Sequence, residues 1–155
     1  MTFKDAMSLV PTSVSIISCI ESSFIFGCTI SSLVSVDISE TSPEIMFVLR
    51  KNSQIGKKIQ TLNHFTINVL SESQQDVAGT FAENREPGLV SGPDWRVQND
   101  RFAELKDSRA VFNCSFNRIY SNHNADIYIG NVENYVFNDL INPLIYDRRE
   151  FKKLS

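Results

Sequence analysis

Residues 24–36 read Phe-Ile-Phe-Gly-Cys-Thr-Ile-Ser-Ser-Leu-Val-Ser-Val, and this stretch decides the fold class. Apolar residues recur at every second position, at Phe24, Phe26, Cys28 and Ile30. A period of two is the pattern of a β-strand, because successive side chains of a strand point to opposite faces of the sheet. The stretch therefore predicts a strand that ends in a segment rich in hydroxyl side chains.

Extended segments continue on both sides of this stretch. Small polar and β-branched residues over 13–20 precede it, and the Glu-Ser-Ser sequence at 21–23 predicts a hairpin turn. After it, residues 33–36 form another extended segment. The unbroken apolar run at 45–49 predicts a central, well-buried strand.

Three short helices interrupt the strands. We expect the first to follow Thr2 as its N-cap and to end at Pro11. The second follows Ser53, and the third follows Ser71 or Ser73. The apolar positions at helical spacing are Phe3, Met7 and Val10 in the first, Ile55, Ile59 and Leu62 in the second, and Val77, Ala78, Phe81 and Ala82 in the third.

Strands dominate the rest of the chain. Residues 84–101 predict a loop, whereas the remaining predicted strands cover 65–70, 110–116, 127–132, 135–137 and 144–146. Many short strands with inserted rather than alternating helices favour a mainly β fold, an antiparallel barrel, over a parallel α/β sheet. With 155 residues, of which 42% are hydrophobic, we expect 1–155 to form one domain.

Composition excludes several classes of function. A net charge of −3 with scattered Lys and Arg argues against nucleic acid or an anionic membrane as a partner. No apolar run approaches the length of a membrane span, and the N-terminus lacks a secretory signal, so we expect a cytoplasmic protein. Cys19, Cys28 and Cys114 are widely spaced in apolar segments, which predicts buried, reduced thiols and no metal site.

The segment Gly-Cys-Thr-Ile-Ser-Ser-Leu-Val-Ser-Val at 27–36 resembles the stretch that lines the flavin site in the flavin reductase-like family. The resemblance continues in order through Arg-Lys-Asn-Ser at 50–53, Phe-Thr-Ile-Asn-Val-Leu-Ser at 65–71, Val-Ala-Gly-Thr-Phe-Ala at 77–82 and Ile-Tyr-Ile-Gly-Asn-Val at 127–132. It implies an antiparallel Greek-key split barrel of the FMN-binding type. It also implies a homodimer that binds FMN, with FAD as an alternative, and uses NADH or NADPH as reductant, commonly to supply reduced flavin to a separate flavin-dependent monooxygenase.

No Gly-x-Gly-x-x-Gly or Gly-x-x-x-x-Gly-Lys-Ser/Thr loop is present, so a nucleotide must be held in another way. A flavin needs hydrogen-bonding groups along its ring edge, donors for its phosphate and an apolar wall. The run 29–35 offers the first set, although by itself this pattern favours hydroxyl residues that only occupy a strand end. With the resemblance, the candidate ring and ribityl contacts are Thr29, Ile30, Ser31, Ser32 and Ser35.

Candidate phosphate ligands lie in the segment before the second helix. Lys51, Asn52 and Ser53 precede a helix start, where unpaired backbone N–H groups favour an anion, although Ser53 could be only an N-cap and Lys51 only a solvated charge. Arg85 is a second candidate. The resemblance adds contacts from Phe81 and Ala82 at the flavin's edge and from Thr12, although a Phe on the apolar stripe of a helix is most often a core residue.

His123 is the candidate catalytic residue, because the family has a Gly-Asp-His sequence near the nicotinamide. In this sequence His123 lies two residues earlier than that position, so either a longer loop still brings it to the site or the role is lost. Asn131 also replaces an Arg of the family, and Thr12-Ser13 replaces Thr-Gly.

Three functions follow. The first is an NAD(P)H:flavin oxidoreductase. The second is a non-catalytic flavin carrier or sensor, and the third is an oxidase of the same fold with tightly bound FMN. Flavin retention on purification separates an oxidase from a reductase that exchanges its flavin.

Overall fold

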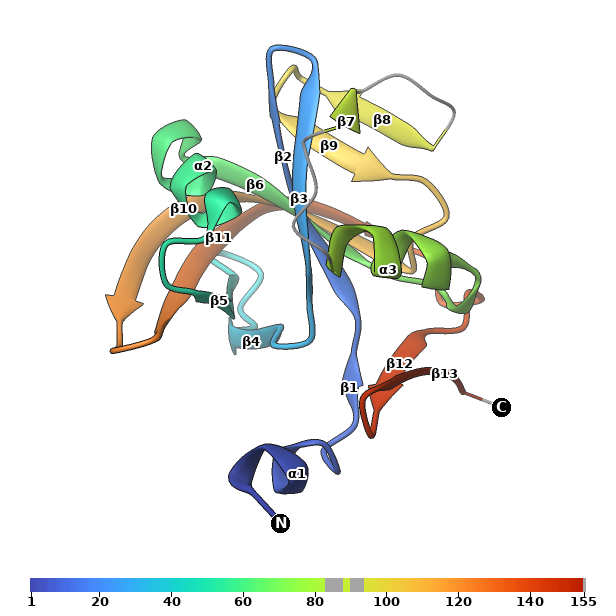
Figure 1. The fold of residues 1–155 in the computed structure, drawn as a ribbon. Helices are drawn as coiled ribbons and strands as arrows, with labels where there is room; N and C mark the ends of the chain where they lie inside the picture. The colour runs from blue at the N-terminus through green and yellow to red at the C-terminus, as the bar shows by residue number, and fades with distance from the viewer. Residues whose placement is uncertain (83–87, 90–93, 155) are drawn as a thin grey trace.

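The computed structural model describes residues 1–82, 88–89 and 94–154, and strands dominate it (Figure 1). The helices are α1 (Phe3–Met7), α2 (Gln54–Leu62) and α3 (Gln75–Ala82), the last preceded by a 3₁₀ turn at Glu72–Gln74. The strands are β1 (Thr12–Ser13), β2 (Ser15–Glu21), β3 (Phe24–Ile30), β4 (Val34–Asp37), β5 (Glu44–Arg50), β6 (His64–Val69), β7 (Gly88–Leu89), β8 (Trp95–Gln98), β9 (Phe102–Leu105), β10 (Ala110–Ser121), β11 (Ala125–Phe137), β12 (Leu144–Asp147) and β13 (Glu150–Lys153).

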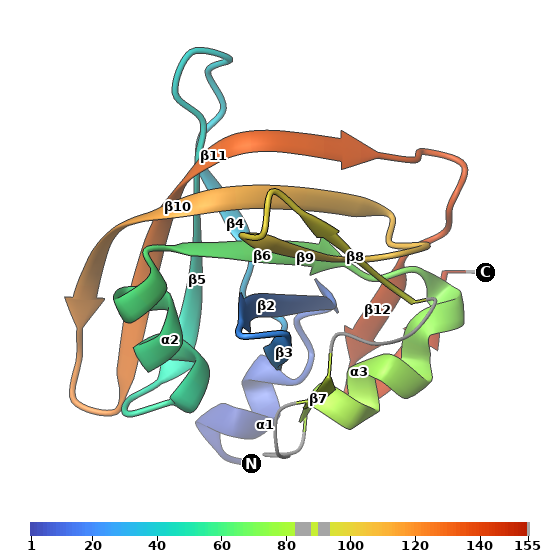
Figure 2. The ribbon, with the colours of Figure 1, turned by 90° about the horizontal axis from the view of Figure 1, so that it is seen from above.

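The main sheet is antiparallel, with the strand order β4-β5-β11-β10-β6-β2-β3-β7. It curls into a barrel, with α2 and α3 beside it (Figure 2). The turn after β3 reaches β5, where the amide of Val48 donates to Ser32 Oγ at 2.9 Å. Two smaller sheets, β1-β12-β13 and β8-β9, complete the structure. The predicted mainly β barrel is therefore confirmed.

The hairpin between β2 and β3 confirms the predicted turn. Glu21 pairs with Phe24, so Ser22 and Ser23 alone connect the strands. Both serines have positive φ, 50° and 68°. Two successive left-handed residues match the twist of the strands they join, which makes this a tight hairpin turn.

Two strand predictions were wrong. Strand β5 is second from the end of the sheet, and only its inward side chains Ile45, Phe47 and Leu49 are buried. The predicted loop 84–101 contains β8, which pairs with β9. The apolar pattern does not reveal β8 and β9, because polar residues on both strands form a hydrogen-bonded cluster against the barrel. In this cluster Arg96 donates to Glu104 at 2.7 Å.

Two helices confirm their predicted N-caps, whereas Ser71 precedes the 3₁₀ turn and α3 itself begins only at Gln75. Thr2 and Asp5 form a capping box, and Ser53 Oγ accepts from the amide of Gly56 at 2.9 Å. Helix α1 is shorter than predicted, because it ends at Met7 and not at Pro11. None of its residues is buried, so no packing against the rest of the protein stabilises a further helical turn. No helix among the described residues is long and apolar enough to cross a membrane.

The barrel interior holds the larger of two apolar cores. Phe47 stacks on Tyr128 with ring centroids 5.4 Å apart and meets Phe65 edge to face at 5.3 Å. The smaller core lies beside α3 and includes Ile16 and Leu70. All three cysteines are free thiols, as predicted, but only Cys19 and Cys114 are buried, whereas Cys28 is half-buried. Burial raises the pKa of Cys19 to about 12.

Candidate functional site

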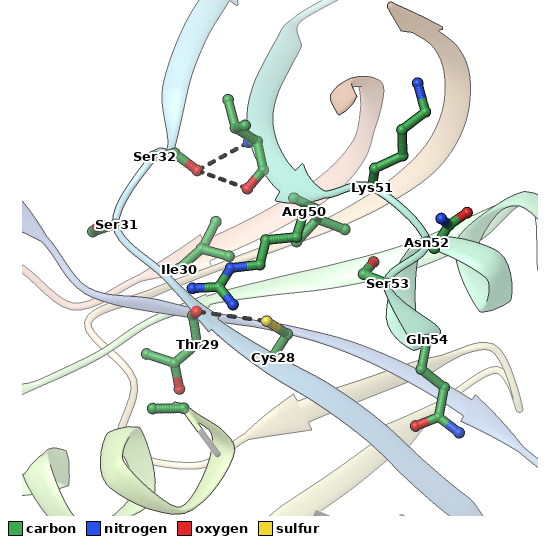
Figure 3. Close-up of a pocket in the computed structure, with 13 residues that line it drawn as sticks. Cys28, Thr29, Ile30, Ser31, Ser32, Arg50, Lys51, Asn52, Ser53 and Gln54 are labelled. Carbon is green, nitrogen blue, oxygen red and sulfur yellow. Dashed lines mark hydrogen bonds between the residues drawn. The ribbon is translucent and has the colours of Figure 1, made fainter. Parts of the chain in front are cut away.

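A cavity of about 810 Å³ opens where the end of β3 faces the end of β5 and the start of α2 (Figure 3). Its volume lies in the range of small-molecule sites. Two segments and the last residue of α3 line it: Cys28, Thr29, Ile30, Ser31 and Ser32; Val48, Leu49, Arg50, Lys51, Asn52, Ser53 and Gln54; and Ala82. The structure thus brings together most of the predicted flavin contacts.

A tight turn at Asn52 shapes one wall of this cavity. Asn52 has a φ of 63°, a left-handed conformation that asparagine tolerates better than most residues. The amide of Ser53 donates to the carbonyl of Arg50 at 3.2 Å, and Ser53 then caps α2. Ser53 accepts from the third amide of α2, that of Gly56. The first two amides, those of Gln54 and Ile55, are therefore left without a partner inside the helix. This end of the cavity therefore suits an anion.

Arg50 and Lys51 point in different directions from this turn. The guanidinium of Arg50 extends across the cavity towards Cys28 and Thr29 (Figure 3). The ammonium of Lys51 instead donates to the backbone carbonyl of Asn122 at 2.7 Å. Sequence reasoning selected Lys51 and missed Arg50, although Arg50 ends a strand whose alternate residues face outward.

Hydroxyl groups of the β3 wall are partly engaged in holding the cavity together. Thr29 Oγ1 donates to the carbonyl of Ala78 in α3 at 2.7 Å, which leaves its lone pairs for a ligand. Ser32 Oγ accepts from the amide of Val48 and so fastens the turn to β5. Ser31 is exposed on the same wall.

A second cavity, of about 220 Å³, shares Thr29, Ile30, Ser31 and Ala82 with the first. Its remaining lining residues are apolar: Val14, Tyr146 and Phe151. The two aromatic rings lie 5.5 Å apart and come from the β12–β13 hairpin. A polar cavity with a cationic end therefore adjoins an apolar cavity with aromatic walls.

Burial and a nearby charge shift the pKa of Cys28 in opposite directions. Burial raises the pKa of the Cys28 thiol, and the nearby Arg50 guanidinium lowers it by a smaller amount. Cys28 Sγ lies 3.6 Å from the carbonyl of Thr29. The thiol is therefore protonated at neutral pH and acts as a weak donor inside the wall.

Other predicted site residues lie outside the larger cavity. Ser35 lines a groove beside β4, and Thr12 on β1 has a buried Oγ1 without a hydrogen-bond partner in the described residues. Phe81 packs on Trp95, and its ring occupies the space that a Cβ at Gly27 would fill. Arg85 lies outside the described residues.

His123 lies at the tip of the β10–β11 hairpin, where it is exposed. The amide of Lys51 donates to the carbonyl of Asn124 at 3.1 Å, so the tip borders the cavity rim without lining the cavity. Asn131 is engaged on the barrel wall, where it accepts from Asn117 at 3.0 Å. Among the described residues no cluster of three or more His, Cys, Asp or Glu could hold a metal ion.

The fold and the site together define an antiparallel β-barrel with a polar cavity of small-molecule size at a helix N-terminus. Residues 7–155 match the family described as "Flavin reductase like domain", and the chain belongs to this family. It is 34% identical over 122 residues to a "Probable flavin reductase" of Rhizobium meliloti, an alignment that covers 79% of this chain and 38% of that protein. It is 24% identical over 132 residues to the reductase subunit HsaB of a flavin-dependent monooxygenase from Mycobacterium tuberculosis, covering 85% of this chain and 69% of that subunit.

The fold is also that of a solved bacterial flavin reductase. The crystal structure of BorF, the flavin reductase component of a two-component tryptophan halogenase, superposes with a TM-score of 0.88 at 22% identity. The superposition covers 98% of this chain and 96% of BorF. The predicted split barrel and the predicted family are therefore confirmed. The chain spans little more than a third of the length of its Rhizobium relative.

Proposed function

We propose that this chain binds FMN in the 810 Å³ cavity and transfers hydride to it from NADH or NADPH. The observation that carries the proposal is the position of Arg50 and the α2 N-terminus opposite the hydroxyl-bearing end of β3. This arrangement gives one cavity a cationic end and a polar wall, which are the groups that a flavin phosphate and ribityl chain require.

Each end of the site would hold a different part of the cofactor. Arg50 and the first amides of α2 hold the phosphate, because a guanidinium and unpaired N–H groups bind phosphate oxygens well. Thr29 and Ser31 offer hydroxyl oxygens to the ribityl chain and ring edge. The apolar cavity at Tyr146 and Phe151 has the flat aromatic walls that suit a ring system.

The bound flavin supplies the hydride acceptor, so the chain itself needs no general base for this step. Its residues fix the distance and orientation of the two reactants, which is the main contribution a protein makes to such a transfer. In this proposal His123, on the hairpin at the cavity rim, contacts the nicotinamide of the reductant. Substitution of His123 by Ala should therefore change the KM for nicotinamide more than the affinity for FMN.

The active species in this proposal is a homodimer. Exposed apolar side chains gather on β4, on the segment after it and on the end of β11, and Ile38 is 84% and Phe137 71% exposed. A groove of about 330 Å³ in the same region is lined by residues of β4, of the segment after it and of β11. Single-chain proteins seldom leave such a patch uncovered. A second copy covers it, and light scattering at micromolar concentration tests this.

We further propose a single domain over 1–155 that acts in the cytoplasm and delivers reduced flavin to a separate monooxygenase. The names of the relatives support the last part, because HsaB is the reductase subunit of a flavin-dependent monooxygenase. FMN is preferred over FAD in this proposal because no adenine pocket is recognisable in the sequence.

Anaerobic flavin absorbance tests the function directly. Purified protein with excess FMN or FAD receives NADH or NADPH, and the flavin absorbance should fall rapidly with one of these pairs. FMN that binds but keeps its absorbance would support the carrier or sensor. Protein that purifies with bound flavin and resists both nicotinamides would support the oxidase.

A further inference from the structure

Lys51 is the side chain for which the structure and the sequence pattern suggest different roles. Its position before a helix start favours a phosphate ligand, whereas its ammonium donates to the carbonyl of Asn122 at 2.7 Å. In Figure 3 it extends away from the Cys28–Ser32 wall, while Arg50 extends towards that wall. The lysine that borders the cavity is thus directed at the neighbouring hairpin.

The hairpin tip at 122–124 has few other attachments. Its last strand pair is Ser121 with Asp126, and the amide of Asn122 closes the tip on the carbonyl of Ala125 at 2.8 Å. Outside the hairpin, the described residues give this tip two hydrogen-bonding partners, both from Lys51: the ammonium, and the backbone amide that donates to Asn124 at 3.1 Å. The backbone bond survives substitution of Lys51, and the ammonium bond does not.

We propose that Lys51 is a positioning residue, which holds the 122–124 tip at the cavity rim so that His123 meets the nicotinamide. This inference rests on the proposed function. The phosphate is then held without the Lys51 ammonium, by Arg50 and the α2 amides. Lys51 therefore acts on the reductant step through the hairpin and leaves flavin affinity unchanged.

The Lys51→Met variant separates the two roles. We expect its KM for the preferred nicotinamide to rise roughly three- to tenfold, the size of one lost hydrogen bond, with kcat and the Kd for FMN unchanged. Lys51→Arg keeps a cationic donor and should restore the KM. Lys57→Met is the matched control, because Lys57 is an exposed lysine one turn into α2, and its KM should equal that of the wild type.

A double-mutant cycle tests whether the effect passes through His123. In a His123→Ala background, Lys51→Met should change the KM by less than about twofold, because coupled residues are not additive. Additive effects would overturn the assignment. A Kd for FMN that rises about tenfold or more in Lys51→Met, with an unchanged KM, would overturn it too and make Lys51 a phosphate ligand.

Hydrogen exchange gives a readout that does not depend on activity. Amides at 121–125 should exchange faster in Lys51→Met than in the wild type or in Lys57→Met, because the tip has lost an attachment. Unchanged exchange would overturn the proposal. Wild-type protein that fails to reduce any flavin would refute the proposed function, and the exchange result would still decide whether Lys51 holds the hairpin.

Discussion

The two faces of β5 serve different purposes. Inward, Ile45, Phe47 and Leu49 are buried in the barrel, whereas outward Val48 and Arg50 are exposed on the cavity wall. Close contacts between apolar groups hold the inner face in place. The outer face depends on the turn at 51–52, a helix cap and single hydrogen bonds. Substitutions inside should therefore lower stability, and those outside should lower affinity.

The largest effect is expected at Phe47, which is fully buried between Phe65 and Tyr128. Phe47→Ala should lower the free energy of unfolding by about 3–5 kcal/mol, from lost burial and the cavity left behind. Urea denaturation measures this. On the other face, Val48→Ala should cost less than about 1 kcal/mol, because that side chain is already 37% exposed. Equal losses would contradict the division of β5 into two faces.

Gly56 in α2 lies between the barrel interior and the cavity wall, because an added Cβ there would meet Tyr128 of the interior and Ser53 of the wall. A Cβ there would overlap Tyr128 Oη and would lie 2.7 Å from Ser53 Oγ, the cap of α2. Gly56→Ala should therefore cost about 1–3 kcal/mol, as overpacking does. Differential scanning calorimetry measures the change in Tm.

Two further variants sharpen the Gly56 prediction. Adding Tyr128→Phe removes the overlapping hydroxyl and should restore part of the stability. Gly79→Ala in α3 is the control, because nothing lies within 4 Å of its added Cβ. That change should stabilise the protein by roughly 0.5–1 kcal/mol through helix propensity. A destabilising Gly79→Ala, or no recovery with Tyr128→Phe, would contradict the contact argument.

On the cavity wall, Arg50→Met should weaken FMN binding about tenfold or more, close to 1.4 kcal/mol. A guanidinium that bonds a phosphate is lost, while an exposed side chain contributes little to folding. Fluorescence titration of FMN measures the Kd, and urea denaturation should give an unchanged unfolding free energy. Lys57→Met serves again as the charge-matched control. Equal weakening in both variants would point to general electrostatics instead.

The same contrast explains which features the sequence could predict. Local patterns were sufficient for β3, for the turn at Ser22 and Ser23 and for the Ser53 cap, because the residues that determine each feature are neighbours in the chain. Strands β8 and β9 were missed because polar residues interrupt their apolar pattern. Glu104 is buried only because Arg96 and Asn113 donate to its carboxylate, the latter at 2.7 Å. No local pattern shows such a pairing in advance.

Arg50 illustrates the limit at the site itself. Arg50 and Lys51 are adjacent cations of similar length, and composition cannot tell which one enters the cavity. The left-handed Asn52 and the carbonyl of Asn122 decide it, and both depend on how the β10–β11 hairpin lies against β5. The sequence could therefore predict that the segment 50–53 lines the site, whereas the structure was needed to show that Arg50 and not Lys51 enters the cavity.

The smallest effect is expected at His64, on the edge of the interior. Its Nδ1 is buried without a hydrogen-bond partner in the described residues, and burial followed by the charge of Arg101 lowers the pKa of His64 below 6.5. The folded state thus favours the neutral ring. As pH falls below 6.5, the unfolded chain takes up a proton more readily than the folded one, so the free energy of unfolding decreases.

His64→Gln should flatten this decrease in urea denaturation curves measured between neutral and mildly acidic pH. The ion pair of Asp5 with Arg149 does not interfere, because hydrogen bonds to Thr2 and Arg149 lower the pKa of Asp5 from 3.8 to about 2. Stability from that carboxylate is present above 3.8 and is lost only as the pH falls towards 2. A pH dependence as steep in His64→Gln as in the wild type would assign the effect to another group and leave the His64 edge of the barrel without a role in acid sensitivity.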